Sequence, residues 1–105
     1  MSNELLIDKE SVINCLRQNL EYLRQNFYIK RLALFGSFAR GDADLASDVD
    51  LVVEFDRPIG LRFMELCNYL EECLGRRVDV LTLTGVQHIR NPNVSRSILE
   101  SLVYV

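Results

Sequence analysis

Residues 31–55 read RLALFGSFARGDADLASDVDLVVEF, and this stretch decides the predicted fold. The run Arg31–Phe35 is short and apolar and is followed at once by a glycine, which is typical of a strand buried on both faces. A short helix can begin near Ser37 and end by Gly41, and a polar loop follows it. Asp48–Phe55 then predicts a second strand, whose first half alternates aspartate with valine and leucine. The stretch is therefore a strand, a short helix and a strand, with polar residues concentrated between the two strands.

Longer periodic segments lie on both sides of this stretch. Apolar residues recur at three- and four-residue steps over residues 9–26, which predicts an amphipathic helix with Asp8 as its N-cap. Leu61–Leu74 predicts a second long helix that stops at Gly75. The apolar side expected for this second helix consists of Met64, Cys67, Leu70 and Leu74.

The C-terminal third completes the predicted order of elements. Val78–Leu83 (VDVLTL) is typical of a third strand, Asn93 of the cap of a last helix, and Val103–Val105 of a terminal strand. The order is then helix, strand, short helix, strand, helix, strand, helix. This order predicts an α/β (α+β) fold, a small mixed β-sheet with helices packed mainly on one face.

Composition favours one compact domain and excludes several classes of function. With 105 residues, of which 49% are hydrophobic, we expect residues 1–105 to form a single domain. The formal net charge of -3 argues against general nucleic-acid binding, which usually needs a basic face. No stretch reaches the roughly 18 to 20 apolar residues that span a membrane, and Met1–Asp8 lacks the basic segment of a secretory signal. Cys15, Cys67 and Cys73 fit free thiols in a reducing cytoplasm better than a disulfide or a metal site.

Three aspartates interrupt otherwise apolar strands at matched places. Asp48 and Asp50 are two residues apart on one strand, so both project from the same face with Cα atoms about 7 Å apart. Asp79 lies in another strand and joins them if the two strands are neighbours in suitable register. Three ionised carboxylates repel one another, and a divalent cation removes that conflict. Because all-oxygen ligands favour Mg²⁺, we expect Asp48, Asp50 and Asp79 to be both the metal ligands and the catalytic residues.

Gly36-Ser37 supplies the complementary part of the predicted site. A strand ends there, glycine lets the backbone pass close to a ligand, and a helix begins. The helix N–H groups and the Ser37 hydroxyl can hold phosphate oxygens, and Arg40 can steady their charge or pack at the helix end. Phosphate donors and carboxylate-bound magnesium within one short segment predict a nucleoside triphosphate site.

Other polar residues have simpler interpretations. Asp42 and Asp44 are interpreted as loop residues. His88 is the only histidine, so no histidine-based metal cluster or catalytic triad can form, and a loop or surface position is expected for it. The tyrosines are interpreted as aromatics at the edge of the core; they are Tyr22, Tyr28, Tyr69 and Tyr104.

The spacing of the site residues resembles that of the DNA polymerase β-like nucleotidyltransferases. Gly36-Ser37, ten intervening residues and Asp48-Val49-Asp50 match the signature of that superfamily. The fuller string GSFARG at residues 36–41, with SDVD at residues 47–50, is similar to its minimal nucleotidyltransferase (MNT) group. Asp79 in VDVL matches the position of the third acid. Short stand-alone domains of this kind resemble the MntA antitoxins of HEPN/MNT toxin–antitoxin pairs.

This resemblance implies a polymerase β-like fold and a function for each matched residue. Asp48 and Asp50 would hold metal ions, Asp79 would complete the metal site and help to activate the acceptor hydroxyl, and Gly36 and Ser37 would hold the triphosphate. The chain would be a cytoplasmic antitoxin that uses Mg²⁺ and ATP to transfer AMP to a hydroxyl, expected to be a tyrosine, of a partner HEPN ribonuclease toxin. We expect an oligomer with the toxin and no direct contact with nucleic acid or membrane.

Two alternatives to this function stay open at the level of sequence. One is a non-catalytic antitoxin that masks the toxin by binding it. The other is a nucleotidyltransferase for a small molecule such as an antibiotic, although 105 residues leave little room for a domain that shapes such an acceptor pocket. Retention of all three acids favours the enzyme.

Overall fold

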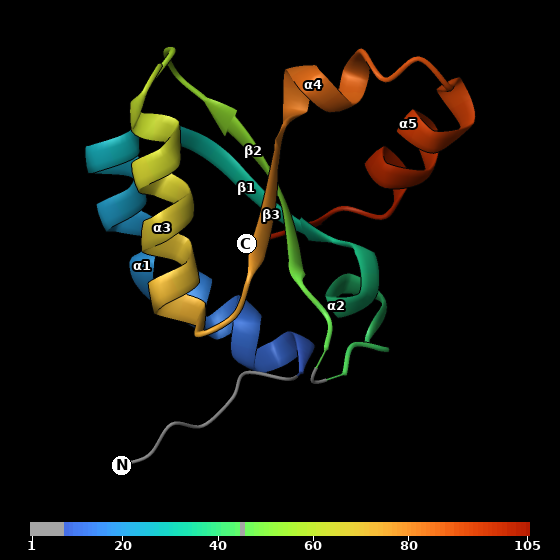
Figure 1. The fold of residues 1–105 in the computed structure, drawn as a ribbon, viewed down its shortest axis with the longest axis horizontal. Helices are drawn as coiled ribbons and strands as arrows, with labels where there is room; N and C mark the ends of the chain where they lie inside the picture. The colour runs from blue at the N-terminus through green and yellow to red at the C-terminus, as the bar shows by residue number, and fades with distance from the viewer. Residues whose placement is uncertain (1–7, 45) are drawn as a thin grey trace.

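The structure is a computed structural model that describes residues 8–44 and 46–105 (Figure 1). Its elements build the α/β arrangement that the sequence predicts. In chain order they are α1 (Lys9–Phe27), β1 (Ile29–Phe35), α2 (Gly36–Arg40), β2 (Val49–Phe55), α3 (Arg62–Leu74), β3 (Val78–Thr82), α4 (Leu83–Gln87), α5 (Pro92–Glu100) and β4 (Val103–Tyr104).

The β-sheet is mixed and has the strand order β3-β2-β1-β4. β1 runs antiparallel to both β2 and β4, whereas β2 and β3 are parallel. Parallel neighbours need a crossover connection, and α3 supplies it between β2 and β3. The predicted small mixed sheet is therefore confirmed, and its parallel pair contains the two strands with acidic residues.

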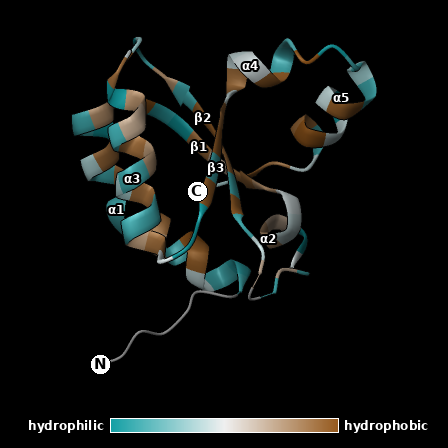
Figure 2. Ribbon diagram, in the orientation of Figure 1, coloured by the Kyte–Doolittle hydropathy of each residue, from teal (hydrophilic) through white to brown (hydrophobic). Residues whose placement is uncertain are grey.

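One face of the sheet carries the hydrophobic core. α1 and α3 lie side by side along this face (Figure 1), and hydrophobic and hydrophilic residues alternate around both helices (Figure 2), as in helices with one buried side. Their buried side chains are Val12, Leu16, Leu23 and Phe27 of α1 and Leu66, Leu70 and Leu74 of α3. The strand residues in the same cluster are Ile29, Leu32, Leu34, Val49, Leu51 and Val53. Helices packed mainly on one face are thus confirmed.

The opposite face of the sheet is covered over a shorter length. Val86 of α4 is fully buried, and α4 contacts β2. α5 packs on α4, where Ser95 Oγ donates a hydrogen bond of 2.9 Å to the Val86 carbonyl, but no side chain of α5 is itself buried. Because α4 follows the end of β3 directly, this cover lies at the carboxyl ends of the two parallel strands (Figure 1).

Several predicted boundaries are confirmed by their capping geometry. The Asp8 carboxylate accepts a hydrogen bond of 2.7 Å from the Ser11 amide at the start of α1. Gly75 ends α3 with φ of +67°, in the left-handed region that favours glycine. The three cysteines are free thiols, as predicted. None of the helices described has the length and apolar character needed to cross a membrane.

Three details of the prediction were wrong. Met64 is 67% exposed, and Leu66 lies on the buried side of α3 instead; two residues turn a helix by about 200°, so these side chains face opposite ways. The last helix is capped by Asn91, which accepts from the Asn93 amide, with Pro92 as its first residue. β3 ends at Thr82, because the Thr82 hydroxyl caps the short helix α4. The apolar pattern of residues 78–83 predicted a strand as far as Leu83 and did not indicate this helix.

The corrected face of α3 gives the first testable prediction. Leu66→Ala removes a fully buried side chain and is expected to lower the free energy of unfolding by at least about 2 kcal/mol. Met64→Ala on the same helix removes an exposed side chain and is expected to change it by less than about 0.5 kcal/mol. Chemical denaturation of the two variants measures both changes. Equal losses in the two variants would contradict the assigned face.

Candidate active site

The register of β2 and β3 brings acidic residues together on one face of the sheet. Asp50 and Asp79 are direct partners in this parallel pair, so their Cα atoms are about 4.8 Å apart and their side chains share a face. Asp48 immediately precedes β2 and lies two residues before Asp50, which places it on the same face. Val49 and Leu51, which alternate with them, are buried in the core. The acids therefore lie on the side of the sheet that α1 and α3 do not cover.

Gly36 lies directly against one of these acids. β1 pairs with β2 so that Phe35 is the partner of Asp50, and the chain turns into α2 at Gly36 with φ of +74°. A Cβ added to Gly36 would overlap the Asp50 carboxylate oxygen Oδ2. Any larger residue at position 36 would consequently displace Asp50, and the left-handed backbone favours glycine independently.

Ser37 follows Gly36 in the first turn of α2. We call Gly36, Ser37 and Asp50 the corner of the site. Ser37 is half-buried next to Gly36, and no side chain caps the start of α2. The end of α2 is tied back, because the amides of Gly41 and Asp42 both donate to the Ser37 carbonyl at 3.0 Å. The first turn of α2 thus begins directly after the glycine that lies against Asp50, and its role as a phosphate-binding turn stays a prediction.

Partial burial and acidic neighbours set the electrostatics around Asp50. Partial burial, and then the nearby charges of Asp79 and Asp48, raise the pKa of Asp50 above its ordinary value, while Arg40 acts against this rise. Arg77 lies near Asp48, with Nε 4.0 Å from Oδ1. Repulsion between carboxylates destabilises their ionised forms, and a bound divalent cation would reverse that effect.

The carboxylates fit Mg²⁺ by chemistry and by position on the sheet. Among residues 8–44 and 46–105, no three histidine, cysteine, aspartate or glutamate side chains form a ready-made metal cluster. Asp48 and Asp79 are exposed beside Asp50, and carboxylate oxygens are the ligands that Mg²⁺ prefers. Gly36 leaves the space beside Asp50 free of a side chain.

Asp48 and Asp79 are exposed, whereas Asp50 is half-buried. A hollow of about 620 Å³ lies between the start of α1 and the loop after α2, lined by Asp8, Lys9, Glu10, Ser11, Asn14, Gly41 and Ala43. Its lining includes none of the three acids.

The loop between α2 and β2 holds the other acids named in the sequence. Arg40 and Asp42 form an exposed ion pair, with Nε and Oδ2 3.2 Å apart. The Asp44 carboxylate accepts from the Ala46 amide at 2.9 Å and from the Ser47 hydroxyl at 3.2 Å. Asp42 and Asp44 are thus loop residues that support local structure, as the sequence indicates.

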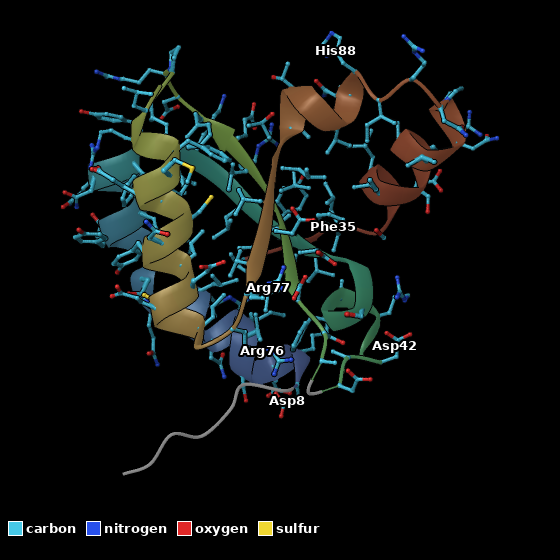
Figure 3. The ribbon with its side chains drawn as sticks, viewed as in Figure 1. Asp8, Phe35, Asp42, Arg76, Arg77 and His88 are labelled. Atoms are coloured by element: carbon cyan, nitrogen blue, oxygen red, sulfur yellow. The ribbon has the colours of Figure 1, made fainter. Side chains whose placement is uncertain are left out.

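Two arginines that the sequence reasoning passed over lie at this end of the molecule. Arg76 and Arg77 lie where the chain enters β3 (Figure 3). The guanidinium of Arg76 donates to the Ser47 carbonyl at 2.7 Å and to the Asp44 carbonyl at 2.8 Å. The signal in the sequence was a basic pair directly before the strand that contains Asp79, which a search confined to acids and glycines does not find.

The remaining candidates lie away from the acids. His88 is exposed at the end of α4, at the far end of the molecule from Arg76 and Asp42 (Figure 3). Tyr22 and Tyr69 stack with their ring centroids 4.7 Å apart, and the Tyr69 hydroxyl donates to Asn19 at 2.6 Å. These tyrosines lie at the edge of the core, as predicted.

Comparisons with known proteins find a family model and several relatives that match most of this chain. The nucleotidyltransferase domain model matches residues 16–105. A Methanocaldococcus jannaschii protein, provisionally named a protein adenylyltransferase, is 43% identical over 86% of this chain and 90% of its own length. The protein adenylyltransferase MntA of Thermococcus cleftensis is 34% identical over 95% of this chain and 98% of its own length.

Solved structures share the arrangement of helices and strands. One provisionally described as a minimal nucleotidyltransferase superposes with a TM-score of 0.72 at 30% identity, over 93% of this chain and 96% of that one. A chain from a crystal structure of a toxin–antitoxin with AMP-PNP superposes with a TM-score of 0.61 at 20% identity, over 93% and 72% of the two chains. The second likeness shows the fold alone.

Proposed function

The chain belongs to the nucleotidyltransferase domain family, and from this premise we propose that it transfers AMP from ATP to a hydroxyl of a partner protein. The observation that carries the proposal is the register of Asp50 and Asp79, with Asp48 on the same face and Gly36 fitted against Asp50. Relatives that align over nearly the whole chain are named protein adenylyltransferases, and this supports a protein as the acceptor.

The proposed reaction is an in-line displacement at the α-phosphate of ATP. The acceptor oxygen forms a bond to the α-phosphorus, the bond from that phosphorus to the bridging oxygen of the β-phosphate breaks, and pyrophosphate leaves. Gly36 and Ser37 hold the triphosphate, Arg40 steadies its charge, and Asp79 helps to remove the acceptor proton, which passes on to water. Asp48, Asp50 and Asp79 would hold Mg²⁺, which lowers the pKa of the acceptor hydroxyl and neutralises charge on the leaving group.

We further propose that the acceptor is a tyrosine of a HEPN ribonuclease toxin and that AMP transfer silences this toxin in the cytoplasm. The MNT-type spacing of the site supports this partner, and a neighbour in fold comes from a toxin–antitoxin crystal structure with AMP-PNP. The open position of Asp48 and Asp79 fits an acceptor presented by another protein.

Labelled ATP identifies the bond that breaks. We expect label at the α-phosphorus, but not label at the γ-phosphorus, to appear on the partner toxin in the presence of Mg²⁺ and to be absent with EDTA. Gel separation of the proteins followed by autoradiography measures both. Transfer of γ-label would make the chain a kinase and contradict the proposal. A stable complex without label would indicate masking by binding, and label on an added aminoglycoside instead of the toxin would indicate a small-molecule enzyme.

A further inference from the structure

Arg76 joins two backbone segments that the sequence places far apart. Its guanidinium lies within hydrogen-bonding distance of two carbonyls of the loop before β2. One terminal nitrogen donates to the Asp44 carbonyl at 2.8 Å and to the Ser47 carbonyl at 2.7 Å, and Nε donates to Ser47 at 3.2 Å. The guanidinium also lies over the ring of Phe38, 5.2 Å from its centroid. Arg76 thus contacts α2, the loop after it and, through its own backbone, the entry to β3.

These contacts surround the residues of the candidate site. Ser47 directly precedes Asp48, and Phe38 lies two residues after Gly36 in α2. Arg76 itself lies three residues before Asp79 in the chain. A second link reinforces the same corner, because the Val49 amide donates to the Arg77 carbonyl at 2.9 Å. One side chain, that of Arg76, therefore contacts both the loop before Asp48 and the helix that begins at Gly36.

We propose that Arg76 is a positioning residue that holds Asp48, and residues 42–44, 46 and 47 of the loop before it, in the arrangement that binds a divalent cation with a nucleoside triphosphate. This inference rests on the proposed function, whose site it deepens. Asp48 is exposed and precedes the strand, so the sheet register alone does not fix its backbone. Groups that orient metal ligands in this way typically change metal affinity by about 10- to 100-fold when they are removed.

An arginine suits this position better than a lysine. The planar guanidinium donates from several nitrogens in one plane and stacks on an aromatic ring at the same time, whereas an ammonium group is a compact point charge. Phe38 is fully buried, so the ring offers a fixed platform. Lysine at position 76 is therefore expected to keep the charge but to hold only part of the loop.

Calorimetric titration tests this role without catalysis. Mn²⁺ is titrated into the protein in the presence of an ATP analogue that cannot be cleaved between its α- and β-phosphates. We expect Arg76→Met to raise the metal dissociation constant about 10-fold, and Arg76→Lys to raise it less. Arg57→Met is the matched control, because Arg57 also lies over an aromatic ring, with its guanidinium carbon 4.5 Å from the Tyr28 centroid, but follows the far end of β2. The Arg57→Met variant is expected to bind Mn²⁺ with the same dissociation constant as the wild type.

The outcomes separate this inference from the proposed function. If the wild type binds the metal–nucleotide pair and a folded Arg76→Met binds it within about twofold of the wild type, Arg76 only packs against Phe38 and the inference is wrong. If Arg76→Met does not fold, Arg76→Lys decides by the same criterion. If the wild type itself binds no metal–nucleotide pair, the proposed function fails and the inference fails with it. Faster amide exchange of residues 42–44 and 46–48 in Arg76→Met than in Arg57→Met would support the role in the metal-free protein.

Discussion

Asp50→Asn is expected to lower the rate of AMP transfer by about 1,000-fold while the chain stays folded. The substitution removes the charge of a proposed metal ligand, which lies between its partner Asp79 and the nearby Asp48. Asparagine has nearly the same shape, so it keeps the fit against Gly36. The rate of transfer to the partner toxin and the thermal unfolding of the variant measure both effects.

Asp56→Asn is the matched control for this variant. Asp56 follows the far end of β2 and is exposed, so its replacement changes the net charge equally without touching the site. Its transfer rate is expected to stay within about twofold of the wild type, as for most surface substitutions. A folded Asp50→Asn variant that transfers AMP as fast as Asp56→Asn would remove Asp50 from the mechanism.

The wild type and Asp50→Asn also test the electrostatic argument, through the pH dependence of their unfolding free energies. The pKa of Asp50 is raised above 3.8 by burial and by its acidic neighbours. An acid whose pKa rises on folding stabilises the protein fully below its ordinary pKa and loses that contribution as pH rises through the raised value. In EDTA, the wild type should therefore lose stability relative to Asp50→Asn as pH rises from below 4 toward neutrality. A constant difference between the two unfolding free energies would contradict this expectation.

Gly36→Ala is expected to lower transfer by at least about 100-fold and also to destabilise the chain. The new Cβ would overlap the Asp50 carboxylate, so Asp50 must move away from the position that faces the other acids. The left-handed backbone adds a cost of about 1 kcal/mol for any residue with a side chain. Steady-state transfer assays and chemical denaturation measure the two losses.

Gly60→Ala separates the steric effect from the backbone effect. Gly60 also has positive φ, +55°, but a Cβ there would meet nothing within 4 Å. We expect it to lose a similar amount of stability from backbone strain alone and to keep its transfer rate. Equal activity of the two alanine variants would show that the contact between Gly36 and Asp50 has no part in the site.

Much of this fold can be predicted from the sequence because its signals are local. The period of the apolar residues in α1, the cap at Asp8 and the stop at Gly75 depend only on neighbouring residues. α4 was missed because Leu83 continues the apolar run of β3, and only the Thr82 hydroxyl, which caps Gly85, marks the change. Met64 was misplaced because it lies three residues before Cys67, whereas Leu66 lies four residues before Leu70. Both steps are typical of one face of a helix, so spacing alone does not choose between them.

Part of the candidate site can likewise be predicted from the sequence, and the rest depends on how the chain folds. Gly36, Ser37, Asp48 and Asp50 lie in one short stretch whose spacing the sequence displays directly. That Asp79 joins them depends on which strands are neighbours and in which register, and only the pairing of Asp50 with Asp79 decides this. The basic pair before β3 is visible in the sequence, but the role of Arg76 is not, because it consists of contacts to carbonyl groups, which every residue carries.

The central claim is that Asp48, Asp50 and Asp79 direct AMP from ATP onto a partner protein. Intact-mass spectrometry of the candidate toxin tests it most directly, after incubation with ATP, Mg²⁺ and either the wild-type chain or Asp48→Asn. The account predicts a gain of the mass of one AMP group with the wild type and none with the variant, and peptide fragmentation should place the group on a tyrosine. An unchanged toxin mass in a stable complex with the wild-type chain, or an equal gain with Asp48→Asn, would contradict the account.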